Sequence, residues 1–117
     1  MPDRGKTRRV KISPELRSIL REFSADLLKR YADRYRGLRL YGSQARGEAR
    51  AESDVDLILV LGDASRPTRE IDRISDLIVD YNLRYGILLS VVPVDERTLK
   101  TSEGPFWRNV RREGVAA

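Results

Sequence analysis

Two long segments of the chain carry apolar residues at the three- and four-residue spacing of an amphipathic helix. The first begins at residues 13–15, where Ser-Pro-Glu supplies a hydroxyl cap, a proline in the first helical position and an acid in the first turn. It is predicted to run to about Arg34 and to be stopped by Gly37. The second opens at Pro67 and ends before Gly86. The predicted buried stripes are Leu16, Leu20, Phe23, Leu27 and Tyr31 in the first helix, and Ile71, Ile74, Leu77, Ile78 and Tyr81 in the second.

Three shorter runs predict strands. Leu38 to Tyr41 is a short one, and Val55 to Leu61 is a nearly continuous apolar run of the kind found in strands covered on both faces. Ile87 to Val92 is the third, closed by Pro93, and a final helix is predicted from Pro105 to about Glu113. The order helix, strand, strand, helix, strand, helix indicates a two-layer domain of the α/β (α+β) class, with a small sheet of about three strands and helices packed against it.

The length of 117 residues suits one domain. We assign it to residues 12–117, after a flexible basic arm at residues 1–11. The chain has no cysteine, and no segment resembles a signal peptide or a membrane span, so a cytoplasmic location is expected.

The chain also has no histidine, so a bound metal would need oxygen ligands, which suit magnesium or manganese. The net charge of +5 favours phosphates, nucleic acid or an acidic partner. The same charge is equally typical of ion-pair networks that support heat stability, and the composition does not separate the two readings.

The residues with the clearest chemistry lie between Tyr41 and Val60. Gly42-Ser43 follows a predicted strand, where backbone N–H groups and a hydroxyl can bind phosphate, although an ordinary turn has the same composition. Asp54 and Asp56 alternate at the start of an apolar strand, so both carboxylates project from one face and repel each other unless a cation lies between them. Alternatively, Asp54 caps the loop and Asp56 pairs with an arginine.

Ten residues separate Ser43 from Asp54, enough for a turn, a short loop and entry to a neighbouring strand. The phosphate-binding turn and the carboxylate pair can then face each other across adjacent strand ends. Nucleotidyl transfer needs a triphosphate and a metal ion placed in this way.

The pattern Gly-Ser, ten residues, Asp-x-Asp resembles the signature of the DNA polymerase β-like nucleotidyltransferase superfamily, and the fuller strings G-S-x-A-R-G and S-D-x-D-L resemble its minimal prokaryotic members, the MNT proteins. The resemblance covers about Leu16 to Val94 and implies the nucleotidyltransferase fold. It implies that Asp54 and Asp56 bind magnesium or manganese and are catalytic, and that Gly42, Ser43 and Arg46 bind the nucleotide, ATP.

The resemblance also implies a partner. Minimal members are commonly paired with a helical HEPN protein that acts as a toxin, and some transfer AMP to a tyrosine of that toxin. An antitoxin of this type is therefore expected, without direct nucleic-acid binding and with the oligomeric state open. Phe106 and Trp107 could anchor such a partner or close the core. A small-molecule acceptor such as an aminoglycoside is disfavoured because little chain remains to build a second pocket.

One feature departs from active members, which carry a third carboxylate on the next core strand. The corresponding segment here, residues 87–92, has Ser90 as its polar residue. Asp95 has the wrong strand parity relative to Ser90, and Asp80 belongs to the preceding helix. This departure opens an alternative in which the protein is a catalytically weak or inactive nucleotide-binding member that neutralises or scaffolds its HEPN partner by binding alone.

Overall fold

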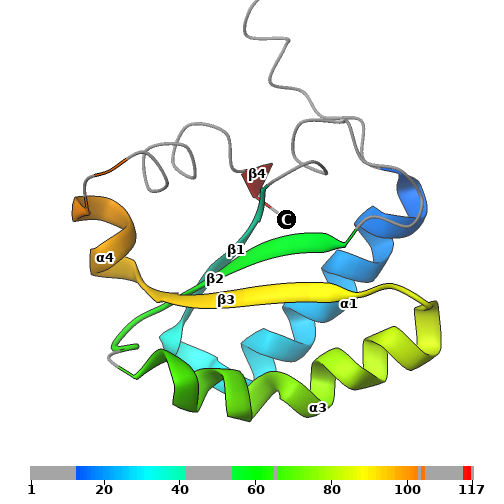
Figure 1. Cartoon of the computed structure of the whole chain (residues 1–117), viewed down its shortest axis with the longest axis horizontal. Helices are drawn as coiled ribbons and strands as arrows, with labels where there is room; N and C mark the ends of the chain where they lie inside the picture. Colours follow the sequence, from blue (N-terminus) through cyan, green and yellow to red (C-terminus); the bar gives the residue numbers. More distant parts are fainter. Residues whose placement is uncertain (1–12, 42–53, 65, 103, 105–114, 117) are drawn as a thin grey trace, which may run out of the picture.

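A computed structural model describes residues 13–41, 54–64, 66–102, 104 and 115–116 (Figure 1). The elements are α1 (Pro14–Tyr31), the 3₁₀ turn η2 (Ala32–Arg34), β1 (Tyr35–Tyr41), β2 (Val55–Leu61), α3 (Pro67–Tyr85), β3 (Leu89–Asp95), α4 (Glu96–Thr101) and β4 (Val115–Ala116). Among the helices of the described residues, none combines the length and the apolar character that crossing a bilayer requires.

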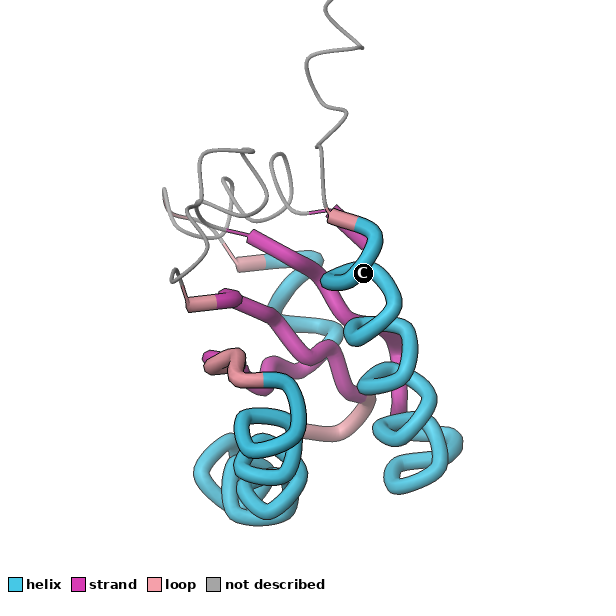
Figure 2. Tube along the Cα trace, turned by 90° about the vertical axis from the view of Figure 1, so that its right-hand side faces the viewer, coloured by secondary structure: helices cyan, strands magenta, loops and turns pink. Residues whose placement is uncertain are grey.

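The strands form a mixed sheet in the order β3-β2-β1-β4. β1 is antiparallel to both β2 and β4, whereas β2 and β3 are parallel and α3 connects them. In the turned view of Figure 2 the strands run alongside one another. The predicted α+β class and a sheet of about three strands are confirmed, and the two-residue β4 adds a fourth strand.

The two long helices begin and end largely where their capping residues predict. The Ser13 hydroxyl accepts a hydrogen bond from the backbone N–H of Leu16 at 3.1 Å, and Gly86 ends α3 in the left-handed region with φ 68°. The prediction that Gly37 stops the first helix is wrong. Gly37 lies inside β1 with φ 139°, next to a register shift against β2, and this bulge needs a conformation that glycine adopts readily.

The main core lies between the sheet and the two long helices. One face of β2 contributes Val55, Leu57, Leu59 and Leu61 to it, and we call this face of the sheet the inner face. The opposite, outer face carries a smaller cluster, which consists of Ile58, Val60, Val94 and Leu99, with Tyr41 packed against it. Because Leu57 and Ile58 are both fully buried, β2 is covered on both faces, as its apolar sequence predicts.

The third strand differs from its predicted bounds. It begins at Leu89 and continues through Pro93 to Asp95, so Pro93 does not close it. Proline is tolerated here because β3 is an edge strand among the described strands. A proline whose missing N–H would point away from β2 removes no hydrogen bond between the strands. The short α4 was not predicted from the sequence. The arm at residues 1–11, the predicted helix from Pro105 to Glu113, and with it Phe106 and Trp107, lie outside the described residues.

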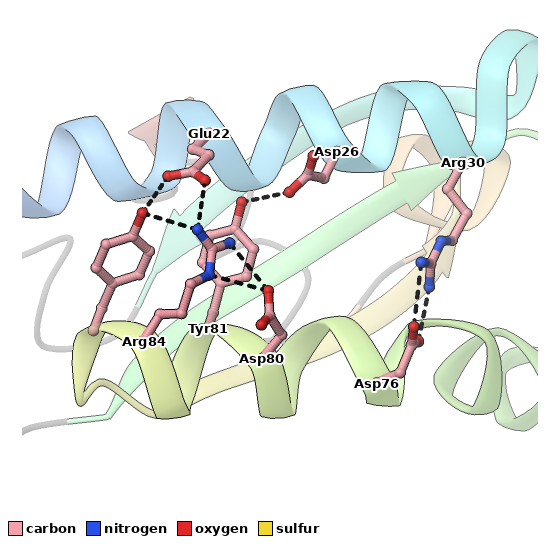
Figure 3. A network of polar contacts seen from close by, with 8 residues as sticks. Glu22, Asp26, Arg30, Asp76, Asp80, Tyr81 and Arg84 are labelled. Carbon is pink, nitrogen blue, oxygen red and sulfur yellow. Dashed lines mark hydrogen bonds and ion pairs between the residues drawn. The ribbon is translucent and has the colours of Figure 1, made fainter.

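Polar contacts join α1 to α3 along their length (Figure 3). In this antiparallel pair, residues early in α1 meet residues late in α3. The contacts join Glu22 to Arg84 at 3.0 Å, Asp26 to the Tyr81 hydroxyl at 2.6 Å, and Arg30 to Asp76 at 2.8 Å. They hold the two helices in fixed register on the inner face of the sheet.

Candidate functional site

Asp54 and Asp56 lie at the start of β2, near one end of the sheet. Asp56 is opposite Tyr41 of β1 and opposite Ser90 of β3. Side chains alternate along a strand, so Asp56 shares the outer face with Ile58, whereas Val55 points into the main core. Alternation also places Asp54 toward the outer face, and the two predicted carboxylates are therefore neighbours.

The surroundings of Asp56 disfavour its charged form. Its side chain is half-buried, and partial burial, followed by the nearby charge of Asp54, raises its carboxyl pKa above the usual value. Burial and then the charge of Asp56 raise the pKa of the Tyr41 phenol. Between the described residues, no lysine or arginine forms an ion pair with either aspartate. A cation placed beside these carboxylates would relieve their repulsion.

The donor set fits a hard divalent cation. The described residues contain no group of three or more His, Cys, Asp or Glu side chains that could hold a metal ion. Two carboxylates are nevertheless what magnesium commonly takes from a protein, since substrate phosphates and water complete its octahedral coordination. Asp54 and Asp56 would therefore hold the metal together with a bound nucleotide.

The predicted phosphate-binding residues Gly42, Ser43 and Arg46 lie outside the described residues. The described strand leading to them, β1, ends at Tyr41 directly opposite Asp56. The described chain resumes at Asp54, so both flanks of this segment are at the carboxylate end of the sheet.

The third-strand position expected to carry an acid is Ser90, which is exposed and aligned with Asp56 in the β2–β3 register. Asp95 is at the other end of β3, opposite Leu61, and accepts hydrogen bonds from the backbone N–H groups of Ala64 and Arg97. These bonds lower the pKa of Asp95. Asp80 forms an ion pair with Arg84 on α3. Neither acid can replace a carboxylate at position 90.

Sequence reasoning missed Tyr41 as a part of this site. Its half-buried ring packs against the outer-face cluster while its backbone is opposite Asp56. The sequence signal for Tyr41 was its position immediately before Gly42, at the end of a strand in which buried and partly exposed residues alternate. Besides burial, the charge of Asp56 raises the pKa of the Tyr41 phenol, which shows that the phenol and this carboxylate lie within electrostatic reach of each other.

Comparisons with known proteins agree with this geometry. Residues 16–107 match the model of the nucleotidyltransferase domain family. One protein of Methanocaldococcus jannaschii, described as a putative protein adenylyltransferase, is 35% identical over 96 residues, covering 81% of this chain and 90% of the relative. A second protein of that organism with the same description is 35% identical over 102 residues, covering 86% and 97% of the two chains.

A solved structure supports the fold. It is described as a putative nucleotidyltransferase from Sulfolobus solfataricus, and it superposes with a TM-score of 0.58 at 16% identity, covering 87% of this chain and 80% of that one. The matched family indicates a nucleotide substrate and, in general, a divalent metal. From the family match and the two relatives together, this chain belongs to the nucleotidyltransferase domain family.

Proposed function

We propose that this protein transfers AMP from ATP to a hydroxyl group of a partner protein, using magnesium held by Asp54 and Asp56. The observation that carries the proposal is the carboxylate pair on the outer face at the start of β2, with the pKa of Asp56 raised by burial and by Asp54. Two relatives described as putative protein adenylyltransferases support the choice of a protein acceptor.

The reaction forms one bond and breaks one. The acceptor oxygen attacks the α-phosphorus of ATP, the bond from that phosphorus to the bridging oxygen of the β-phosphate breaks, and pyrophosphate leaves. The hydroxyl proton passes to solvent, because Ser90 is neutral and far too weak a base to take it. A bound magnesium ion would supply charge neutralisation at the phosphates. Asp54 and Asp56 would orient the nucleotide, with Gly42, Ser43 and Arg46 as the proposed phosphate-binding residues.

The proposal extends to the partner. The sequence resemblance and the net charge of +5 favour an acidic or mixed-charge helical protein of the HEPN type, for which this chain would be the antitoxin. Modification of a tyrosine on that toxin would inactivate it. The reaction takes place inside the cell, where ATP and magnesium are available.

A second candidate function rests on Ser90. An active two-metal site would be expected to have an acid beside Asp56, and the neutral serine there favours a protein that binds nucleotide and partner without fast transfer. Loss of a general base typically lowers a rate by ~10²–10⁴. A stable complex needs only one turnover per partner molecule, so slow transfer and neutralisation by binding are both compatible with an antitoxin.

The test uses as acceptor the product of the gene next to the one that encodes this chain, because minimal nucleotidyltransferases are commonly encoded beside their HEPN partner. The two proteins are co-purified and incubated with ATP and magnesium, and the intact mass of the partner is measured over time. The proposal predicts slow addition of one AMP, absent with Asp56→Asn and with a chelator. A complex that forms but gains no mass in overnight incubation would support the binding-only alternative, and the absence of any complex would contradict both.

A further inference from the structure

An exposed apolar strip adjoins the carboxylate pair on the outer face of the sheet. It consists of Leu88, immediately before β3, with Ser90 and Val92 on β3, and we call it the β3 strip. The side chains of Leu88 and Val92 are 50% and 37% exposed, although both residues are large and apolar. Ser90, between them, is also exposed and is aligned with Asp56.

The backbone fixes the direction of these side chains. The backbone N–H of Val55 donates to the carbonyl of Leu88 at 2.9 Å, so the ladder between β2 and β3 already includes Leu88. Leu89 is in the main core and Val94 is in the outer-face cluster. Alternation along the strand therefore places Leu88, Ser90 and Val92 together on the outer face.

The spacing of the strip matches that of an extended peptide. Residues two apart in a strand are roughly 6.6 Å apart, so Leu88 and Val92 flank Ser90 at equal distances over roughly 13 Å. A peptide with a hydroxyl residue and apolar residues two positions before and after it has the same repeat. Laid along the strip, it would place its hydroxyl over Ser90 and next to Asp56.

The absence of charge on the strip favours a peptide over a polyanion as the acceptor. None of Leu88, Ser90 and Val92 carries a charge, whereas nucleic acid is bound mainly through lysine and arginine contacts to its phosphates. Arg39 shares the outer face, but it lies on β1, and β2 separates it from the strip. Apolar side chains of a polypeptide are the complement that removes Leu88 and Val92 from water.

We propose that the β3 strip is the acceptor-binding surface, and that it selects an extended polypeptide segment with the pattern apolar-x-hydroxyl-x-apolar. This inference rests on the proposed function, because it takes the acceptor hydroxyl to be next to Asp56. It adds the class of acceptor sequence and the residues that select it.

The test measures peptide binding without requiring transfer. The full chain labelled with ¹⁵N is titrated with acetyl-Leu-Asn-Tyr-Asn-Leu-amide in the presence of magnesium and a non-hydrolysable ATP analogue. We expect the largest amide shifts at residues 88–92, and binding weakened about fivefold or more by Leu88→Glu. Leu88→Ile should retain binding. Leu83→Glu is the matched control, because Leu83 is 78% exposed on α3, the helix that packs against the inner face of the sheet, whereas the strip is on the outer face.

The possible outcomes separate this inference from the proposed function. If the analogue binds but the peptide shifts residues elsewhere, or Leu83→Glu weakens binding as much as Leu88→Glu, the strip is not the acceptor surface. Replacing both leucines of the peptide with glutamate should abolish binding. A single-stranded RNA oligomer that shifts residues 88–92 more strongly than the peptide would overturn the choice of a polypeptide. Failure of the analogue to bind at all would instead contradict the proposed function.

Discussion

Ser90 occupies a position at which an acidic side chain would change the net charge around Asp56. It is aligned with Asp56, whose carboxyl already has a raised pKa because of burial and the charge of Asp54. A third carboxylate at this position would increase the repulsion without metal and would strengthen metal binding with it. Under the proposed function, the charge at position 90 therefore determines how fast AMP is transferred.

We expect Ser90→Asp to increase AMP transfer to the partner by about 10², because the new carboxylate can bind metal and accept the proton of the attacking hydroxyl. The variant should also have a lower melting temperature without magnesium and recover it when magnesium and ATP are added. Labelled AMP on the partner is the readout for transfer.

Ser90→Asn is the matched control, since it has nearly the shape of aspartate and no charge, and it should remain as slow as the native protein. Fast transfer by the native protein that is lost in Ser90→Asp would show that position 90 does not correspond to the missing acid.

At the scale of elements, a buried ion pair fixes how α3 leaves the sheet. Glu70 is 4% exposed, and its carboxylate binds the Arg34 guanidinium at 2.6 Å. Arg34 also donates to the backbone carbonyls of Gly62 and Asp63, in the turn that follows β2. A single arginine therefore joins η2, the end of β2 and the first turns of α3.

Replacing Arg34 with methionine should lower the free energy of unfolding by about 2–4 kcal/mol, because it leaves the buried carboxylate of Glu70 with only Arg73 nearby, at 3.8 Å. The matched control is Arg30→Met. Arg30 pairs with Asp76, which is 70% exposed, and its loss should amount to less than about 1 kcal/mol. Urea unfolding of both variants checks this, and equal losses would show that the Glu70 pair contributes no more than a surface contact.

The sequence predicts most elements because their signals are local. The Ser13 cap, the Gly86 stop and the apolar run of β2 each lie within the element that they define. The errors have a tertiary cause. Pro93 is compatible with a strand because β3 is at the edge of the described sheet. Gly37 has the sequence signal of a helix stop, but its positive φ angle belongs to a bulge in β1 against β2.

The carboxylate pair could likewise be predicted from the alternation of Asp54 and Asp56, and the structure places Asp56 opposite Tyr41 and Ser90. The position of Tyr41 before Gly42 is a sequence signal, but its place opposite Asp56 could not be predicted, because that depends on the register between β1 and β2 and on packing over the outer face. The predicted places of Gly42, Ser43 and Arg46 remain predictions, since these residues lie outside the described part of the chain.

At the scale of the whole molecule, the inner face of the sheet forms the main core, whereas the outer face carries the candidate site. The inner face is covered by α1 and α3 and supplies stability through the main core. At one end of the sheet, α4 covers Val60 and Val94 on the outer face. At the other end of the sheet, the outer face carries Asp56, Ser90 and the rest of the β3 strip. The proposed chemistry therefore takes place on a surface whose residues can change without removing the main core.

The most direct test of the central claim is calorimetric titration of the chain with ATP, with magnesium and with a chelator, compared between the native protein and Asp56→Asn. The fold should tolerate this substitution, since it removes a half-buried carboxylate that Asp54 repels. We predict that magnesium tightens ATP binding by about tenfold or more in the native protein and has no effect in the variant. The same magnesium-dependent tightening in folded Asp56→Asn would contradict the claim that this carboxylate pair holds the metal and nucleotide.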